Sequence, residues 1–135
     1  MKRYMLIAVA LLSLLLSFSS CDKNGEQPGN NKVERKIKYV LYTNEDFSDD
    51  EHNITFSVFA RDHERKLLDS AISTMKVKEI PSASNKIVVE KTLVTDASSN
   101  LVVGFTYKIE GVGESWYLDS IPAGQNTKTI EYAFK

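Results

Sequence analysis

The sequence predicts an all-β protein, folded as one antiparallel β-sandwich of seven or eight short strands. Two observations support this fold class. From Val33 onward, apolar and polar residues alternate with a period of two, which is typical of strands with one buried face. The alternating segments recur at intervals of about 8–12 residues with turn residues between them, as in sandwiches. Roughly 100 residues follow Val33, the usual size of a sandwich of immunoglobulin-like architecture.

The clearest strands are those in which large apolar residues occupy every second position, as do Leu101, Val103 and Phe105. On this basis we expect strands over 36–43, 53–61, 86–94, 101–110 and 127–135. The segment 86–94 is apolar on both faces in places, which favours a central strand. Weaker alternation predicts further strands at 65–69, 74–79 and 115–120. A helix over 65–75 is disfavoured, because this segment lacks a continuous apolar stripe.

The segments between the expected strands carry turn residues. Pro122, Ala123 and Gly124 suit a type I turn with Pro at its second position and Gly at its fourth. Residues 96–100 and 111–113 have the length of hairpin loops, and Pro81 ends the strand before it. The turns therefore favour strands that run antiparallel to their neighbours.

The N-terminal segment has the three parts of a secretory signal peptide. Lys2 and Arg3 precede an apolar run over 5–16, and small residues follow it. This run is shorter than the ~20 residues that span a bilayer, which argues against a transmembrane anchor. We therefore expect residues 1–20 to be a signal peptide that is removed on export.

Cys21 is the only cysteine of the chain, and Phe18, Ser19 and Ser20 precede it. This junction resembles the lipobox of bacterial lipoproteins, and the whole layout is similar to that of small lipoproteins of Gram-negative bacteria. The resemblance implies a lipid anchor such as palmitate on Cys21, and attachment to the outer membrane in preference to the inner one. The body would then lie in the periplasm or at the cell surface. Ordinary cleavage near Ser20, which leaves a free thiol, is the alternative.

The predicted organisation is a signal peptide at 1–20, the lipidated Cys21 with a flexible linker at 21–32, and a β-sandwich at 33–135. Residues 22–32 contain no large apolar side chain, so they have nothing to bury. The chain has 17 Lys and Arg against 18 Asp and Glu, without the basic surplus typical of nucleic-acid binders. The expected membrane contact is therefore made by the lipid.

The sequence contains little that resembles catalytic machinery. His52 and His63 are the only histidines, and neither lies near a Gly-x-Ser-x-Gly nucleophile motif. Acylation of Cys21 would consume the only thiol. We therefore predict a protein that is not an enzyme, with no catalytic residue and no cofactor.

The loop over 44–52 is the most acidic part of the sequence. Its carboxylates include a candidate Ca²⁺ ligand set, namely Asp46, Asp49, Asp50 and Glu51. The spacing does not match an EF-hand, and the loop has no Gly for a sharp turn. A solvated acidic tip that binds no metal is the favoured alternative.

Trp116 and Tyr117 are candidate ligand-binding residues, because aromatic rings on a sheet face form platforms for sugars. Adjacent strand residues point to opposite faces, so at least one of the pair is expected to face inward. We favour Trp116 as a core anchor, because large aromatic side chains dominate core packing.

The function that these observations favour is a membrane-anchored, non-enzymatic envelope lipoprotein, acting as a binding or structural module. Its partner would be another envelope protein or a glycan, contacted through loops or an edge strand. The alternative is a calcium-dependent carbohydrate-binding or adhesion accessory module, which would use the acidic loop and the aromatic residues.

Overall fold

The computed structural model describes residues 31–63 and 65–135. The predicted signal peptide, Cys21 and most of the linker lie outside these residues. The described chain forms seven strands and a short 3-10 helix, in the order β1 (Lys32–Thr43), β2 (Asn53–Asp62), β3 (Arg65–Lys76), η2 (Val77–Glu79), β4 (Ile87–Asp96), β5 (Leu101–Ile109), β6 (Gly113–Ile121) and β7 (Thr127–Phe134). The prediction of an all-β sandwich is confirmed, with seven strands.

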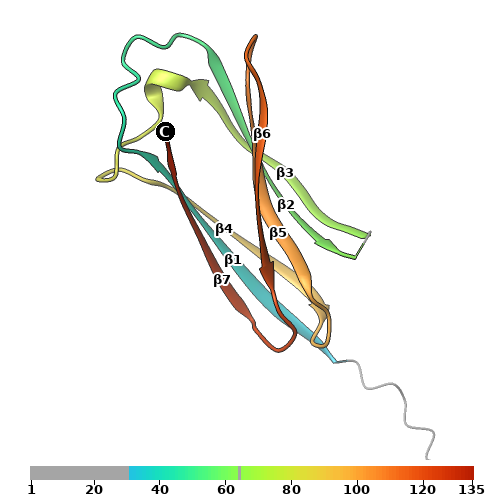
Figure 1. Cartoon of the computed structure of the whole chain (residues 1–135). Helices are drawn as coiled ribbons and strands as arrows, with labels where there is room; N and C mark the ends of the chain where they lie inside the picture. The colour runs from blue at the N-terminus through green and yellow to red at the C-terminus, as the bar shows by residue number, and fades with distance from the viewer. Residues whose placement is uncertain (1–30, 64) are drawn as a thin grey trace, which may run out of the picture. The chain divides into compact units, whose positions relative to one another are not determined.

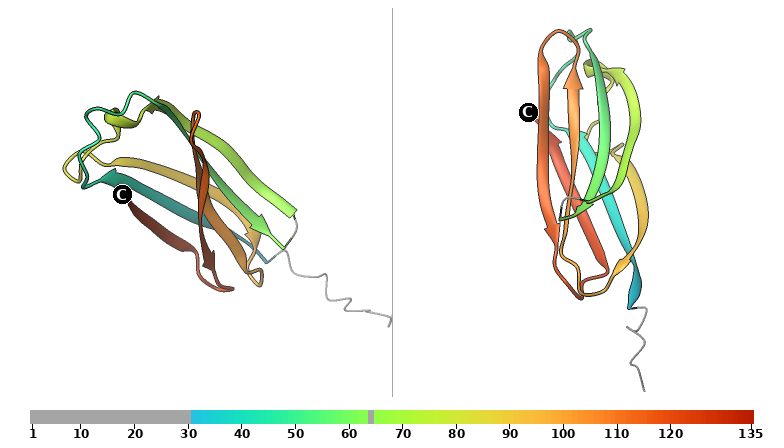
Figure 2. Two further views of the ribbon diagram at one scale, coloured as in Figure 1. Left: turned by 45° about the horizontal axis from the view of Figure 1, so that its top comes forward. Right: turned by 90° about the vertical axis from the view of Figure 1, so that its right-hand side faces the viewer.

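The strands form two sheets that face each other across a common core (Figures 1 and 2). The three-stranded sheet has the order β4-β1-β7, and the four-stranded sheet has the order β3-β2-β5-β6. All pairs are antiparallel except β1 with β7, which is parallel. The turn after β6 delivers the chain to the end of the sandwich where β1 begins, and the Lys36 amide donates to the Asn126 carbonyl there at 2.8 Å. Strand β7 therefore runs alongside β1 in the same direction.

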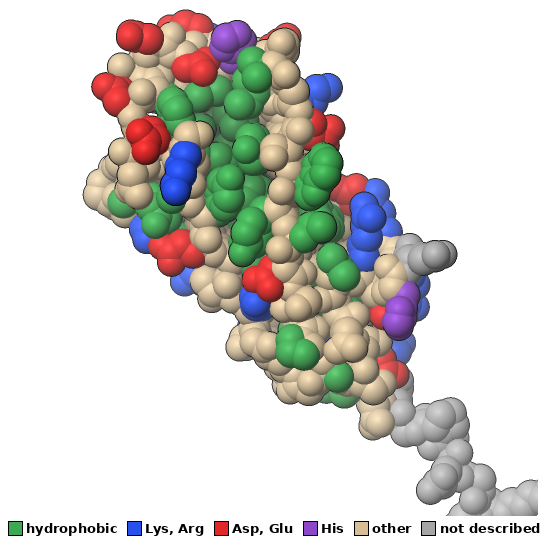
Figure 3. Space-filling model, in the orientation of Figure 1, with side chains coloured by type: hydrophobic (Ala, Val, Ile, Leu, Met, Phe, Trp, Pro, Cys, Tyr) green, Lys and Arg blue, Asp and Glu red, His purple; other side chains and the backbone are tan. Residues whose placement is uncertain are grey.

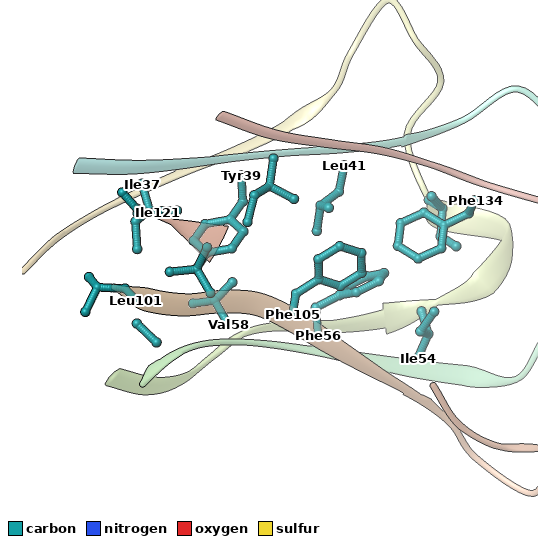
Figure 4. Packing of buried hydrophobic residues seen from close by; sticks show 14 of the residues in the cluster. Ile37, Tyr39, Leu41, Ile54, Phe56, Val58, Leu101, Phe105, Ile121 and Phe134 are labelled. Carbon is teal, nitrogen blue, oxygen red and sulfur yellow. The ribbon is translucent and has the colours of Figure 1, made fainter. Parts of the chain in front are cut away.

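The core lies between the sheets (Figure 4) and consists mainly of residues predicted to face inward, together with Val77, Ile80 and Ile121, which were not predicted. Side chains from β1 and β7 meet those from β2 and β5, and the rings of Phe56 and Phe134 approach to 5.1 Å between centroids. The buried cluster contains Ile37, Tyr39, Leu41, Ile54, Phe56, Val58, Ala60, Leu101, Val103, Phe105, Ile130 and Phe134. The alternation of period two therefore identified the buried face of four strands.

Strand β3 is continuous where the sequence predicted two weak strands. Its pairing with β2 shifts register between Phe56 and Ser57 and again between Ala60 and Arg61. Each shift resets which residues face inward, and this interrupts the alternation in the sequence. The prediction of a strand at 74–79 is wrong beyond Lys76, because Val77–Glu79 forms η2.

Strand β4 is an edge strand, so its expected central place is wrong. Its register places Lys91 opposite Ile37 on the inner face, and the Lys91 Nζ donates to the Ser70 hydroxyl on β3 at 3.3 Å. Val88 and Val94 point to the outer face and are exposed. Apolar residues on both faces of β4 are therefore not evidence that both faces are buried.

The turn between β6 and β7 differs by one position from the predicted one. The Gln125 amide donates to the Pro122 carbonyl at 3.1 Å, which makes Pro122 the first residue of the turn. Gly124 is then the third residue and has a φ of 80°. A positive φ at this position is typical of a type II turn, and glycine adopts it without strain.

Candidate functional site

The outer face of the four-stranded sheet carries a group of apolar residues, Phe59, Val102, Trp116 and Leu118, which we call the Trp116 patch. Trp116 is 66% exposed, Leu118 is 55% exposed and Val102 is 41% exposed. Figure 3 shows hydrophobic side chains at the surface along the course of β6. Large apolar residues that gather on a solvent-facing sheet are unusual enough to mark an interaction site.

Backbone pairing fixes the layout of the patch. Phe59 pairs with Gly104, which pairs with Leu118, so these residues form one row across β2, β5 and β6. Thr106 pairs with Trp116 in the next row. Since strands lie about 4.8 Å apart, Phe59 and Leu118 stand roughly 10 Å apart across a residue that has no side chain.

Gly104 makes room for the Phe59 ring. A Cβ atom at this position would lie 2.9 Å from Phe59 Cζ and 2.0 Å from the Tyr117 carbonyl oxygen. The ring consequently lies close to the sheet, and Phe59 is only 8% exposed although it points to the solvent side. Glycine is needed here because the aromatic ring and the neighbouring strand both approach the backbone closely.

Two further contacts hold Phe59 in place. The Arg61 guanidinium lies over its ring, 5.4 Å from the centroid, in a cation–π arrangement. From the inner side, the Tyr39 hydroxyl donates to the Phe59 carbonyl at 3.3 Å. Burial raises the pKa of Tyr39, so this hydroxyl keeps its proton. The floor of the Trp116 patch is therefore supported from both faces of the sheet.

An open depression of about 680 Å³ lies beside Trp116. Its apolar surface comes from the Trp116 patch, and its polar lining includes Ser57, Arg61, Asp69, Thr106 and Glu114. Ligand sites commonly combine an apolar surface with a few polar groups that orient the ligand. The depression has this composition.

The two predicted ligand-binding aromatic residues lie on opposite faces of β6, as alternation requires. Tyr117 faces inward, where its ring stacks on Phe105 at 5.7 Å and contacts Tyr132. Trp116 faces solvent, so the preference for Trp116 as a core anchor is wrong. Register decides this outcome, because Tyr117 pairs with Phe105 across the buried face. Tyr117 is therefore absent from the depression, and Trp116 is its main aromatic residue.

Sequence reasoning missed most of the remaining lining. Arg61 and Leu118 line the depression, and Gly104 lies against the Phe59 ring at its floor. All three occupy outward positions of predicted strands, but the alternation alone gave them no role. A signal was present at Gly104, since a glycine inside a strand indicates a close approach of another group.

Two aspartates of the acidic loop have local hydrogen-bond partners. Asp46 accepts from the Ser48 amide at 3.0 Å, and Asp50 accepts from the His52 amide at 3.0 Å. These hydrogen bonds lower the pKa of each aspartate. Phe47 packs against the core cluster and holds the loop to the sandwich.

The Glu51 carboxylate pairs with two lysines that lie outside the loop. It accepts from Lys78, and its other oxygen lies 2.9 Å from the Lys76 Nζ. These contacts lower the pKa of Glu51 to about 2. Among residues 31–63 and 65–135, no three Asp, Glu, His or Cys side chains are placed to hold a metal ion. The predicted calcium set, which includes Asp49, therefore gains no support from the geometry.

Comparison of the chain with protein-family models, with curated proteins and with solved structures finds no match. Within the part of the chain that the structure describes, no helix is long and apolar enough to cross a membrane. The function must therefore be inferred from the residues of this chain.

Proposed function

We propose that the protein is a lipid-anchored, non-enzymatic binding module of the cell envelope, and that the Trp116 patch is its binding surface. The exposure of Trp116 and Leu118 on a preformed, rigidly supported sheet face carries this proposal. Trp and Arg are the residues most enriched among those that dominate binding energies, and Trp116 and Arg61 both line the depression.

The cost of leaving these residues in water supports a binding role. Aromatic side chains bury about 150–250 Å² each when they are covered, and each Å² of apolar surface removed from water is worth roughly 25 cal/mol. Trp116 forgoes much of this gain in the free protein, because most of its surface is exposed. A ligand that covers the ring recovers it.

The anchor is proposed from Cys21 and the residues before it, which resemble a lipobox. The described chain begins at Asn31, whose carbonyl accepts from the Ala97 amide at 2.7 Å at the end of the sandwich formed by the 96–100 and 122–126 turns.

The binding role can be tested through the only tryptophan of the chain. Biosynthetic labelling with 5-fluorotryptophan gives the mature lipidated protein a single ¹⁹F resonance, from Trp116. We expect a detergent extract of the native envelope to shift or broaden this resonance. Leu118→Glu, which places a charge in the patch, should abolish the response.

Val94→Glu is the matched control, since Val94 is an exposed apolar residue on an edge strand of the other sheet. This variant should respond like the unaltered protein. A ¹⁹F resonance that the extract leaves unchanged would overturn the proposed binding surface. The anchor has a separate test: intact mass should show a diacylglycerol thioether on Cys21, and Cys21→Ala should release the protein from membranes.

A further inference from the structure

The depression beside Trp116 combines an exposed aromatic ring with polar groups of both hydrogen-bonding kinds. The Arg61 guanidinium only donates, the Asp69 carboxylate only accepts, and the Thr106 hydroxyl does both. A complementary ligand needs an apolar face to cover the indole and groups that donate and accept. A pyranose ring has both, because its C–H groups form a flat face and each hydroxyl donates and accepts.

The charges of the lining favour an uncharged ligand. Arg61 brings a positive charge, whereas Asp69 and Glu114 bring negative charges. Asp69 also pairs with Lys66, which offsets part of its charge. A strongly anionic or cationic ligand would meet like charge on one side of the depression.

The span of the depression sets a minimum length for the ligand. Trp116 lies on β6 and Asp69 on β3, which are separated by two intervening strands. At about 4.8 Å per strand, the distance across the sheet is roughly 14 Å. One sugar ring is too short to reach from Trp116 to Asp69, so two or three linked rings are needed.

We propose that the Trp116 patch binds an uncharged oligosaccharide segment. One pyranose ring stacks on the Trp116 indole beside Thr106. The next lies over Gly104, beside the Arg61 guanidinium that covers Phe59, and directs its hydroxyls toward Arg61 and Asp69. The Arg61 guanidinium is already held over Phe59, which reduces the entropy lost on binding. This inference rests on the proposed function, because it names the ligand of the same surface.

A protein partner fits the same residues less well. Stable protein interfaces bury about 800 Å² on each side around a well-packed centre. Here the apolar surface is confined to one indole, Leu118 and Val102, and it borders a depression with a polar lining. A short polyhydroxylated chain matches this small, mixed surface.

Treatment of the envelope extract before it is mixed with the ¹⁹F-labelled protein shows whether the ligand is a glycan or a protein. Periodate cleaves the vicinal diols of glycans, and a broad protease removes proteins. We expect the Trp116 response to survive protease treatment and to disappear after periodate treatment. A response that protease removes and periodate spares would overturn the glycan and leave the proposed function standing. No response to any extract would overturn both.

Defined ligands then test charge and length. The probes are glucose, maltohexaose, cellohexaose, xylohexaose, mannohexaose and, as an acidic comparison, oligogalacturonate. We expect at least one neutral hexasaccharide to bind saturably, and glucose and oligogalacturonate not to bind. Binding of the acidic oligosaccharide alone, or of glucose as tightly as the hexasaccharides, would overturn the proposal.

Variants assign the contacts. Trp116→Ala should weaken binding about thirtyfold, as expected for a dominant contact residue. Arg61→Ala should weaken it about tenfold, through loss of charged hydrogen bonds. Both side chains are exposed, so folding should be unaffected, and Val94→Ala serves as the control. Equal affinity in all three variants would place the glycan elsewhere.

Discussion

The outer faces of the two sheets are both in contact with solvent, but they carry different kinds of side chain. On the three-stranded sheet, Lys38 pairs with Glu90 at 3.9 Å, and Lys86 pairs with Glu131 at 2.5 Å. The Lys86 ammonium also lies over the Tyr42 ring, 4.3 Å from its centroid. This face also exposes Val88 and Val94 on its edge strand β4, whereas the four-stranded sheet exposes the larger Trp116 together with Leu118. Both faces are compatible with folding, so the apolar one requires an explanation other than stability.

The contrast is sharpest where a ring meets the sheet on each face. Tyr42 keeps its ring partly exposed beneath a lysine, and its face is completed by ion pairs between neighbouring strands. The Phe59 ring is covered by the Arg61 guanidinium and occupies the space that a side chain at Gly104 would fill. It forms the floor of a depression. A charged sheet face is typical of surfaces that stay solvated, whereas a supported apolar one is typical of surfaces that bind.

The largest expected effect is that of Gly104→Ala. The new methyl would collide with the Tyr117 carbonyl and the Phe59 ring, so β5 and β6 must separate locally. We expect a loss of about 3 kcal/mol or more in the free energy of unfolding, measured by denaturant titration. Thr92→Ala, on the outer face of the other sheet, should change stability by less than about 0.5 kcal/mol. A mild effect of Gly104→Ala would show that the close approach is not needed.

Phe59→Ala and Trp116→Ala should distinguish the residue that stabilises the sheet face from the residue that binds the ligand. Removal of the buried Phe59 ring should cost about 2 kcal/mol, somewhat less than in a closed core. Trp116→Ala should cost less than about 0.5 kcal/mol, because the ring is mostly exposed, and should nevertheless weaken ligand binding about thirtyfold. Urea unfolding of both variants checks this order. A large loss of stability in Trp116→Ala would mean that the ring has a structural role.

A smaller effect is expected where the two sheets meet at β6 and β7. The Lys128 ammonium lies 2.7 Å from Asp119 and holds the pKa of that carboxyl below its ordinary value. The pair should therefore add stability above the unfolded-state pKa of about 3.9, and lose it as the pH falls through the lower folded-state pKa. Lys128→Met should return the pKa of Asp119 toward its ordinary value in an NMR titration. It should cost less than about 1 kcal/mol at neutral pH.

The smallest expected effect is that of calcium. Since Asp46, Asp50 and Glu51 already accept from local amides or lysines, millimolar Ca²⁺ should leave the melting temperature unchanged. Calorimetry with Ca²⁺ and with a chelator measures this directly. A clear rise in melting temperature would show that the acidic loop binds Ca²⁺ and would favour this loop over the sheet face as the functional site.

Much of the fold was predictable because burial and strand periodicity coincide. Residues such as Phe56, Val58 and Phe105 alternate with smaller or polar ones, and the structure buries them. The pattern failed where a charge occupies an inward position. Arg35 faces the core with no exposed surface, and its Nη2 donates to the carbonyls of Asp96 and Ala97. The sequence therefore indicated a start of β1 at residue 36, four residues too late.

The candidate site was less predictable, because it depends on register. Trp116 and Tyr117 are adjacent and both aromatic, so a shift of one residue would exchange their faces. Pairing of β6 with β5 decides between them, and this pairing is a property of the assembled sheet. Likewise, Gly104 and Phe59 are distant in sequence, and only the register of β2 with β5 brings them together.

Oxidative footprinting in intact cells tests the difference between the two faces most directly. Hydroxyl radicals modify exposed aromatic rings, so Trp116 and Tyr42 report on opposite sheets of the same molecule. We predict that Trp116 is protected in the native envelope relative to the purified protein, and that Tyr42 is modified equally in both. Equal modification of Trp116 in cells and in purified protein would contradict the account.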